Sequence, residues 1–281
     1  MRAGRAACRA EQAILRGEVC SWTEPARRLL CVTVVELPSA VLVPLLDLAD
    51  VRPALDGARE AIDGALRHRA LRRSGDRVAA EVSLRSAVAS AALEGHRYEL
   101  EEVRGGTVTD PVLQGAVRVA REVAGMAQLW PKVPRQVLAR IHVLAGRDVV
   151  DAGMLGRPVG PEVLPRLTNL FGIVTGHTGE VPALLLAAIV HGELLALRPF
   201  AGPSGVVARA AARVTLVSAG VDPRGVLAPE VGHLAREPEY VGAAGAYATG
   251  TPDGVRAWVK HYAAAVELAA AEVGSIAEQV G

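Results

Sequence analysis

Aromatic residues and lysine are both scarce in this chain of 281 residues. Only 3% of the residues are aromatic, whereas 51% are hydrophobic, so alanine, valine and leucine must fill most of any core. Lys132 and Lys260 are the only lysines among 31 basic residues, and the rest are arginines. This bias, together with abundant alanine and glycine, indicates a GC-rich genome rather than a nucleic-acid-binding surface. A net charge of +1 provides no overall field to attract polyanions, so no nucleic-acid partner is expected.

Cysteine is also scarce, and no segment has the pattern of a membrane span. The cysteines are Cys8, Cys20 and Cys31, and their spacing matches no zinc-binding pattern. This usage is typical of a reducing cytoplasm, which is the predicted location. No uninterrupted apolar stretch follows the arginine-rich start, so no signal peptide is predicted. Acidic residues and Pro38 interrupt the apolar run over 29–51 before it reaches the roughly 20 residues that a span requires, so no membrane partner is expected.

The chain divides into an irregular start and a long periodic remainder. Residues 1–30 mix arginine, glutamate and cysteine without a clear period, which predicts a disordered extension or a mis-annotated gene start. From there on, apolar residues recur at helical spacing almost to the end. We therefore predict N-terminal helices over 31–106 that pack with a core over 107–281 as one domain.

The periodic segments predict an all-α fold with one short β-hairpin. Asp110-Pro111 has the N-cap and the first-position proline of a helix start, and Gly220 is the predicted C-cap of a later helix. Residues 146–160 contain four glycines and a proline, and they are the predicted hairpin. Helices are expected at 56–68, 78–97, 111–129, 135–144, 161–174, 182–197, 206–219 and from 252 onward.

Residues 198–209 (RPFAGPSGVVAR) carry the clearest functional signal. They resemble the signature of the Fic family, H-x-F-x-[DE]-G-N-G-R-x-x-R, at Phe200, Gly205 and Arg209. Upstream, residues 90–95 (SAALEG) fit S/T-x-x-x-E-G/N, the inhibitory-helix motif of many Fic proteins. The resemblance spans roughly residues 80 to 265, because weaker likenesses follow in family order. These are Ile141-His142, His191, Tyr240 and the segment from Trp258 to Tyr262.

The resemblance implies a Fic-like helical bundle and a known chemistry. Fic proteins typically transfer AMP from ATP to a protein hydroxyl. A histidine acts as the base, a loop carboxylate holds Mg²⁺, and backbone N–H groups with two arginines bind the phosphates. On this pattern Ser204, Gly205 and Arg209 are the predicted nucleotide-binding residues. The hairpin at 146–160 would be the flap, which docks a segment of a target protein by strand addition.

Several positions depart from the family's pattern. Arg198 stands in the place of the catalytic histidine and cannot act as the base, because a guanidinium group stays protonated. Gly202 stands in the place of the metal-binding acid and offers no carboxylate. Pro203 has no N–H to offer a phosphate, and Val206 replaces the first arginine. We therefore assign no catalytic and no metal-binding residue, and we expect ordinary AMP transfer to be absent.

Ser90, Glu94 and Gly95 are the predicted regulatory residues. In inhibited Fic proteins the glutamate of the helix pairs with the second arginine of the motif and blocks the position of the γ-phosphate. The corresponding pair here is Glu94 and Arg209. A carboxylate and an arginine fork suit bidentate pairing, so the two should lie within hydrogen-bonding reach. The competing interpretation is two surface charges on unrelated helices.

Three functions remain open at this point. The first is a degenerate Fic-like protein that acts in binding or regulation. The second is a rewired enzyme that transfers nucleotidyl or phosphate-ester groups, with Arg198 and Arg209 as phosphate clamps and Ser204 as nucleophile or donor. The third is an alanine-rich helical scaffold with chance motif matches. ATP is the cofactor that these functions leave open, and Mg²⁺ is not expected. His142 and His191 are interpreted as hydrogen-bonded core residues rather than replacement bases.

Overall fold

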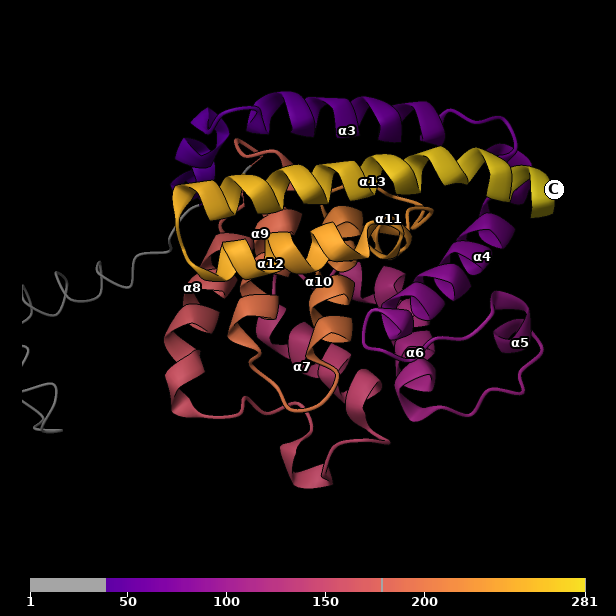
Figure 1. The fold of residues 1–281 in the computed structure, drawn as a ribbon, viewed down its shortest axis with the longest axis horizontal. Coiled ribbons are helices and arrows are strands. Elements are labelled where there is room, and N and C mark those ends of the chain that lie inside the picture. The colour runs from indigo at the N-terminus through magenta and orange to yellow at the C-terminus, as the bar shows by residue number, and fades with distance from the viewer. Residues whose placement is uncertain (1–38, 178, 281) are drawn as a thin grey trace, which may run out of the picture. The chain divides into compact units, whose positions relative to one another are not determined.

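Helices account for every regular element in the described part of the chain (Figure 1). The structure is a computed structural model that describes residues 39–177 and 179–280, so the prediction for residues 1–30 lies outside the described residues. The expectation of an all-α fold is confirmed. The 3₁₀ helices are η1 (Ser39–Asp47), η2 (Ala152–Met154) and η3 (Pro161–Val163). The α-helices are α3 (Val51–Leu66), α4 (Leu71–Ala92), α5 (Leu100–Arg104), α6 (Pro111–Ala127), α7 (Pro134–Gly146), α8 (Leu164–Thr175), α9 (Ala183–Leu197), α10 (Ser204–Ser218), α11 (Pro229–Ala235), α12 (Glu237–Ala248) and α13 (Pro252–Val280).

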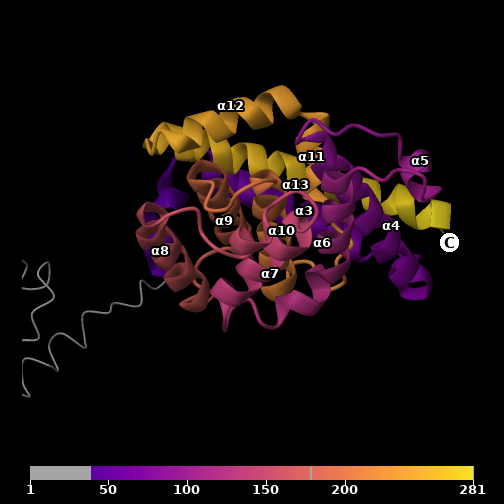
Figure 2. The same ribbon diagram turned by 90° about the horizontal axis from the view of Figure 1, so that it is seen from below.

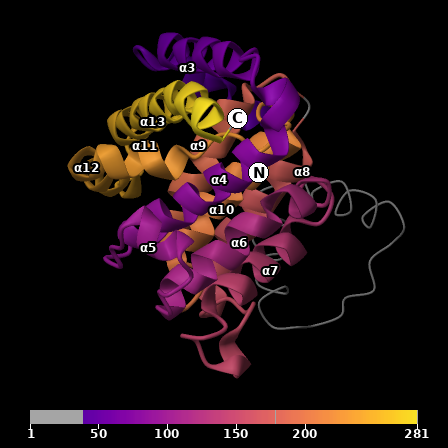
Figure 3. The ribbon, with the colours of Figure 1, turned by 90° about the vertical axis from the view of Figure 1, so that its right-hand side faces the viewer.

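Helices α9 and α10 form the centre of the unit Leu37–Gly281. The sequence of α9 is apolar nearly all round, as expected of a helix that other helices surround. Helix α10 lies between α9 and α6, and it also contacts α4 and α7 (Figure 2). Helices α3 and α13 run side by side across one face and contact α9 (Figures 1 and 3). No described helix has the length and apolar character needed to cross a membrane.

Local signals set most of the helix ends. The Asp110 carboxylate accepts a hydrogen bond from the Leu113 N–H at 2.9 Å and caps α6, as predicted. The C-cap of α10 is Ala219 rather than the predicted Gly220, which follows it with φ +71°. Helix α4 ends at Ala92, five residues before the predicted end, because the chain turns at Gly95 with φ +92°. Helices α5, α11 and α12 were not predicted, since they are short or rich in glycine and alanine.

The β-hairpin predicted at 146–160 is absent, and this part of the prediction is wrong. The N–H groups of Val149 and Val150 both donate to the Gly146 carbonyl, at 2.9 and 2.8 Å. These bonds close a tight turn after α7, so the backbone is not available for a strand ladder. The segment continues through η2 as a loop. The Val159 N–H then donates to the Pro199 carbonyl at 2.9 Å, so the loop still lies against residues 198–203.

Close helix crossings compensate for the scarcity of aromatic residues. A β-carbon at Gly115 in α6 would overlap the Ala145 carbonyl oxygen in α7, and one at Gly232 in α11 would overlap the Ala265 carbonyl oxygen in α13. Glycine at these positions lets the backbones approach, and the helices fill space with few large side chains. The largest buried side chains are Trp130, Trp258 and Tyr262.

A buried cluster of histidine and aromatic side chains joins α9, α11, α12 and α13. His191 Nε2 lies 3.1 Å from the Tyr240 hydroxyl, and His233 Nδ1 lies 3.0 Å from His261 Nε2. Trp258 packs against His191 with ring centroids 4.9 Å apart. Burial lowers the pKa of His191 and of His233 well below the usual 6.5, and it lowers the pKa of His261 to about 4. The cluster is therefore neutral in the folded protein at pH 7.

Acidification should destabilise the protein through this cluster. As the pH falls below 6.5, histidines of the unfolded chain bind protons that His261 in the folded protein excludes until about pH 4. The free energy of unfolding should then fall, by at most about 1.4 kcal/mol per pH unit for each such histidine. The variant His261→Gln should show a shallower pH dependence than the wild type between pH 6.5 and 4.5, measured by urea unfolding. Equal slopes for the two proteins would contradict this assignment.

Candidate functional site

The turn between α9 and α10 carries the family-like motif. Arg198 ends α9 in the left-handed region, with φ +46° and ψ +57°, and its side chain is exposed. Phe200 is buried and stacks on His142, with ring centroids 4.6 Å apart. The Ser204 hydroxyl donates to the Phe200 carbonyl at 2.9 Å, at the start of α10. The aromatic anchor and this hydrogen bond fix the turn against the helices on both sides.

His142 connects the turn to the 146–160 loop. Its Nδ1 accepts a hydrogen bond from the Gly156 N–H at 2.9 Å, so the ring proton lies on Nε2. Nε2 then donates to the Ala201 carbonyl at 2.9 Å. Burial lowers the pKa of His142, which keeps the ring neutral with this fixed tautomer. His142 and His191 are both fully buried and hydrogen-bonded, in agreement with their interpretation as core residues.

A carboxylate side chain would not fit at Gly202, the position of the family's metal-binding acid, without a change in the local structure. Gly202 has φ +75°, which other residues rarely adopt, and a β-carbon there would lie 2.6 Å from Val150 Cγ2. Asp148, in the neighbouring loop, pairs with Arg118 at 2.7 Å. No group of three or more histidine, cysteine, aspartate or glutamate side chains in the described ranges could hold a metal ion. Gly202 supplies no side-chain oxygen to the motif turn.

The turn after α4 brings the Glu94 carboxylate against the first turn of α10. Gly95, with φ +92°, reverses the chain just after Glu94. A β-carbon at Gly205 would overlap Glu94 Oε1 and would lie 2.8 Å from Arg209 Nη1. A side chain at position 205 would therefore have to displace the Glu94 carboxylate and the Arg209 guanidinium. The backbone N–H groups at this helix N-terminus form the natural site for an anion, and Glu94 is the anion beside them.

Arg209 is the most highly coordinated polar side chain of the site. Its guanidinium Nη2 donates to Glu94 Oε1 at 2.8 Å, so the predicted contact is confirmed. Nη2 also donates to the Ser90 carbonyl at 2.9 Å. Arg209 Nε donates to the Ser90 hydroxyl at 2.9 Å, and Nη1 donates to the Tyr240 hydroxyl at 3.1 Å. The Arg209 side chain is 2% exposed and that of Glu94 is 22% exposed. Burial alone would lower the pKa of Arg209, but Tyr240 and Glu94 outweigh it and raise that pKa.

Ser90 is one of two serines of α4 that bond to arginines of α10, and the second arginine was not predicted. The Ser90 hydroxyl accepts a hydrogen bond from Arg209 Nε at 2.9 Å. One turn later in α10 and one turn earlier in α4, Arg213 Nη1 donates to the Ser86 hydroxyl at 2.8 Å. These two arginine–serine pairs form a ladder along the seam between α4 and α10. The spacings S-x-x-x-S and R-x-x-x-R were the available signal.

The structure places Ser204, Gly205 and Arg209 together at the start of α10, beside Ser90 and Glu94 of the regulatory set. Gly95 lies just outside, where it turns the chain. The Ser204 hydroxyl and the Arg209 guanidinium are buried and hydrogen-bonded within the protein. Arg198 is the exposed cation of the turn. In this arrangement the groups predicted to bind phosphate already have protein partners.

Comparisons with known proteins support the fold. No protein-family model matches the chain, and no curated protein matches it. Several solved structures are similar, and two Fic proteins are among them. A Fic family protein from Desulfovibrio desulfuricans G20 has a TM-score of 0.64 and 21% identity, covering 82% of this chain and 76% of that one. Fic-1 (aa134–508) from C. elegans has a TM-score of 0.62 and 18% identity, covering 84% of this chain and 74% of that one. The chain therefore has a Fic-like fold.

Replacement of Gly205 by alanine should destabilise the protein. Alanine within a helix is normally about 1 kcal/mol more favourable than glycine, but here its methyl group would displace Glu94 and Arg209. Gly125→Ala is the matched control, because open space surrounds Gly125 in α6, and it should melt at or above the wild-type temperature. Adding Glu94→Ala to Gly205→Ala should recover part of the loss. If Gly205→Ala alone melts as high as the wild type, the contact is not as described.

Loss of Arg209 should cost more than neutralisation of Glu94. Arg209→Ala removes four hydrogen bonds and should lower the free energy of unfolding by about 3 kcal/mol or more. Glu94→Gln keeps an acceptor oxygen and should cost about 1 kcal/mol. Arg59→Ala, which breaks an exposed pair with Asp63, is the control and should cost less than ~0.5 kcal/mol. Chemical unfolding measures all three, and similar small losses for Arg209→Ala and Glu94→Gln would refute the description.

Proposed function

We propose that this protein uses its Fic-like fold for binding or regulation and does not carry out ordinary AMP transfer to proteins. The observation that carries the proposal is the Glu94 carboxylate, which bonds to Arg209 at 2.8 Å beside the first turn of α10. A nucleotide phosphate would need the same guanidinium and the space beside the first turn of α10 that the carboxylate fills. Glu94 would therefore act as an internal anion that occupies the phosphate position.

The chemistry of the turn supports the same proposal. Arg198 has no basic lone pair, and a missing general base costs about 10²- to 10⁴-fold in rate. Gly202 supplies no carboxylate, and Val150 crowds the space that a side chain would need. Pro203 lacks an N–H at the mouth of the helix. Each departure concerns a different part of the reaction, so restoration of one residue alone would not restore AMP transfer.

The alternative is a rewired enzyme that transfers nucleotidyl or phosphate-ester groups. It would use Ser204 as nucleophile or donor and Arg209 as a phosphate clamp. Both groups are buried and bonded elsewhere, Ser204 to the Phe200 carbonyl and Arg209 to Ser90, Glu94 and Tyr240. This alternative therefore needs the turn and α4 to move apart before any substrate binds. No observation favours such a movement over the binding role.

A protein segment is the proposed partner, docked at the 146–160 loop. The loop lies against the motif turn through the Val159–Pro199 backbone bond. Several large apolar side chains on and around the loop are 36% to 44% exposed. They are Val143, Val149, Met154, Val159 and Leu164. Because the loop has no strand, docking would depend on these apolar side chains more than on the strand addition that the sequence suggested.

Protein labelling from ATP should be absent even after Glu94 is removed. The Glu94→Gly variant frees Arg209 and the α10 N-terminus, yet Arg198 still cannot act as a base. Incubation of wild type and variant with labelled ATP and Mg²⁺ should leave both proteins and added protein targets unlabelled. Calorimetry should detect no Mg²⁺-dependent ATP binding to the wild type at micromolar concentration. Labelling that appears with Glu94→Gly and is lost again with Arg198→Ala would overturn the proposal, and metal-dependent ATP binding would favour the rewired enzyme.

A further inference from the structure

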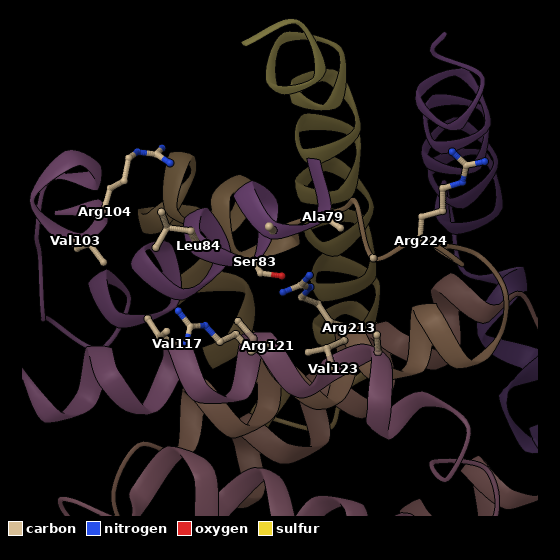
Figure 4. Close-up of a pocket in the computed structure, with 14 residues that line it drawn as sticks. Ala79, Ser83, Leu84, Val103, Arg104, Val117, Arg121, Val123, Arg213 and Arg224 are labelled. Carbon is tan, nitrogen blue, oxygen red and sulfur yellow. The ribbon is translucent and has the colours of Figure 1, made fainter. Parts of the chain in front are cut away.

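A pocket lies between α4 and α6, away from the motif turn (Figure 4). Its volume is about 520 Å³, within the usual range for small-molecule sites. Alanines on the facing sides of α4 and α6 leave the space open, because larger side chains at these positions would fill it. The lining comes from α4 (Ala79, Ala80, Ser83, Leu84), α5 (Val103, Arg104), α6 (Val117, Ala120, Arg121, Val123, Ala124), α10 (Arg213) and the loop after α10 (Arg224, Gly225).

Every charged side chain that lines this pocket is an arginine. Arg104 is neutralised by the Glu81 carboxylate, at 2.7 and 2.9 Å, and Arg224 donates to the Leu71 carbonyl at 2.8 Å. Arg121 is exposed and makes no hydrogen bond or ion pair with any residue that the structure describes. Arg121, Arg213 and Arg224 therefore have no hydrogen bond to a carboxylate, and of these Arg121 and Arg213 flank the middle of the pocket in Figure 4.

Arg213 is the buried arginine of the pocket. It is 3% exposed, and Nη1 is its one side-chain nitrogen with a hydrogen-bond partner among the described residues, the Ser86 hydroxyl. In Figure 4 the Arg213 guanidinium and the Ser83 hydroxyl point toward each other in the middle of the pocket. The buried carboxyl groups of Asp222 and Glu230 both lie near Arg213, and Glu230 and Arg213 line a small adjoining cavity of about 10 Å³. Burial raises the pKa of both carboxyl groups although Arg213 opposes this, so the negative charge of each is disfavoured.

The rest of the wall is aliphatic. Leu84, Val103, Val117 and Val123 surround the two cations with methyl groups, so a bare inorganic anion would leave this surface exposed to water. An apolar molecule without charge would leave Arg213 without a partner in a mostly buried position. A ligand that matches both surfaces carries one anionic group and a compact apolar body. Arginine forks bind both carboxylates and phosphate esters, because each presents two acceptor oxygens.

A neighbouring hollow strengthens the positive potential at the mouth. Arg224 borders both spaces, and the second is lined by Arg72, Arg73 and Arg77 with a single acidic residue, Asp76. Clustered charges of one sign raise the local concentration of opposite charge and speed association. This field arises although the whole chain carries a net charge of only +1.

We propose that the α4–α6 pocket binds a small amphiphilic organic anion, with the anionic group on Arg213 and Arg121 and the apolar body against Leu84, Val103 and Val117. The proposal is independent of the function proposed for the motif turn, because none of the residues from 198 to 209 lines this pocket. Recognition needs only the charge and the aliphatic wall. Its affinity should fall with added salt, because one partner in each contact is an ion.

Octanoate and octyl phosphate are suitable probes. Octanol, which has only the apolar part, and inorganic phosphate, which has only the anionic part, are the controls. Calorimetry on the full-length protein should show that at least one of the two octyl anions binds, and that both controls bind at least about tenfold more weakly. Comparison of the two anions then distinguishes a carboxylate from a phosphate headgroup. No binding of either anion at millimolar concentration, or octanol binding as tightly as the anions, would overturn the proposal.

Two variants test the position of the site. Arg121→Gln removes an exposed cation without a protein partner, so the fold should persist while affinity falls about tenfold, the equivalent of about 1.4 kcal/mol. Ala124→Trp, on an exposed position of α6, should fill the mouth and abolish binding. Arg52→Gln, at an exposed arginine of α3 outside the pocket, is the matched control and should bind as the wild type does. Equal affinities for Arg121→Gln, Ala124→Trp and Arg52→Gln would place the ligand elsewhere and refute the proposal.

Discussion

The Arg209 guanidinium is the interaction on which the candidate site depends. It bonds to α4, to the turn after α4 and to α12 at once, through Ser90, Glu94 and Tyr240. An isolated buried charge would cost several kcal/mol, so the fold tolerates Arg209 only because these partners satisfy it. The same contacts affect neighbouring positions. A side chain at Gly205 would displace Glu94 and Arg209, and α4 ends at Ala92, where the chain can turn to place Glu94 beside α10.

The burial of the motif residues suggests why some of them match the family and others do not. Phe200 and Arg209 are buried, and Gly205 lies beneath two side chains, so packing constrains all three matches. Arg198 and Gly202, at the family's base and metal positions, are exposed. Residues that the fold needs are thus the ones that resemble the signature. This pattern accords with the proposal that the turn has a structural and binding role.

The sequence predicted the parts of the fold that local rules determine. Long apolar periods and the Asp110 cap gave most helices, and the paired motifs gave the Glu94–Arg209 contact. The hairpin failed because glycine and proline mark a break in helical structure without saying whether a strand or a turn replaces it. The Arg213–Ser86 pair was missed although the repeated serine and arginine spacings were a signal for it. The α4–α6 pocket was beyond reach, because it arises from the tertiary packing of α4 and α6 with α10.

Helix α6 crosses α7 at Gly115, and α11 crosses α13 at Gly232, so these parts of the core should tolerate larger residues less well than smaller ones. In most proteins, the costly core substitutions are those that remove volume. At the buried positions that are already alanine or glycine, truncation has little left to remove. Enlargement at Gly115 or Gly232 would instead force two backbones apart. At these crossings neutral drift would therefore be confined to small residues, whose codons are GC-rich, so composition and architecture would each preserve the other there.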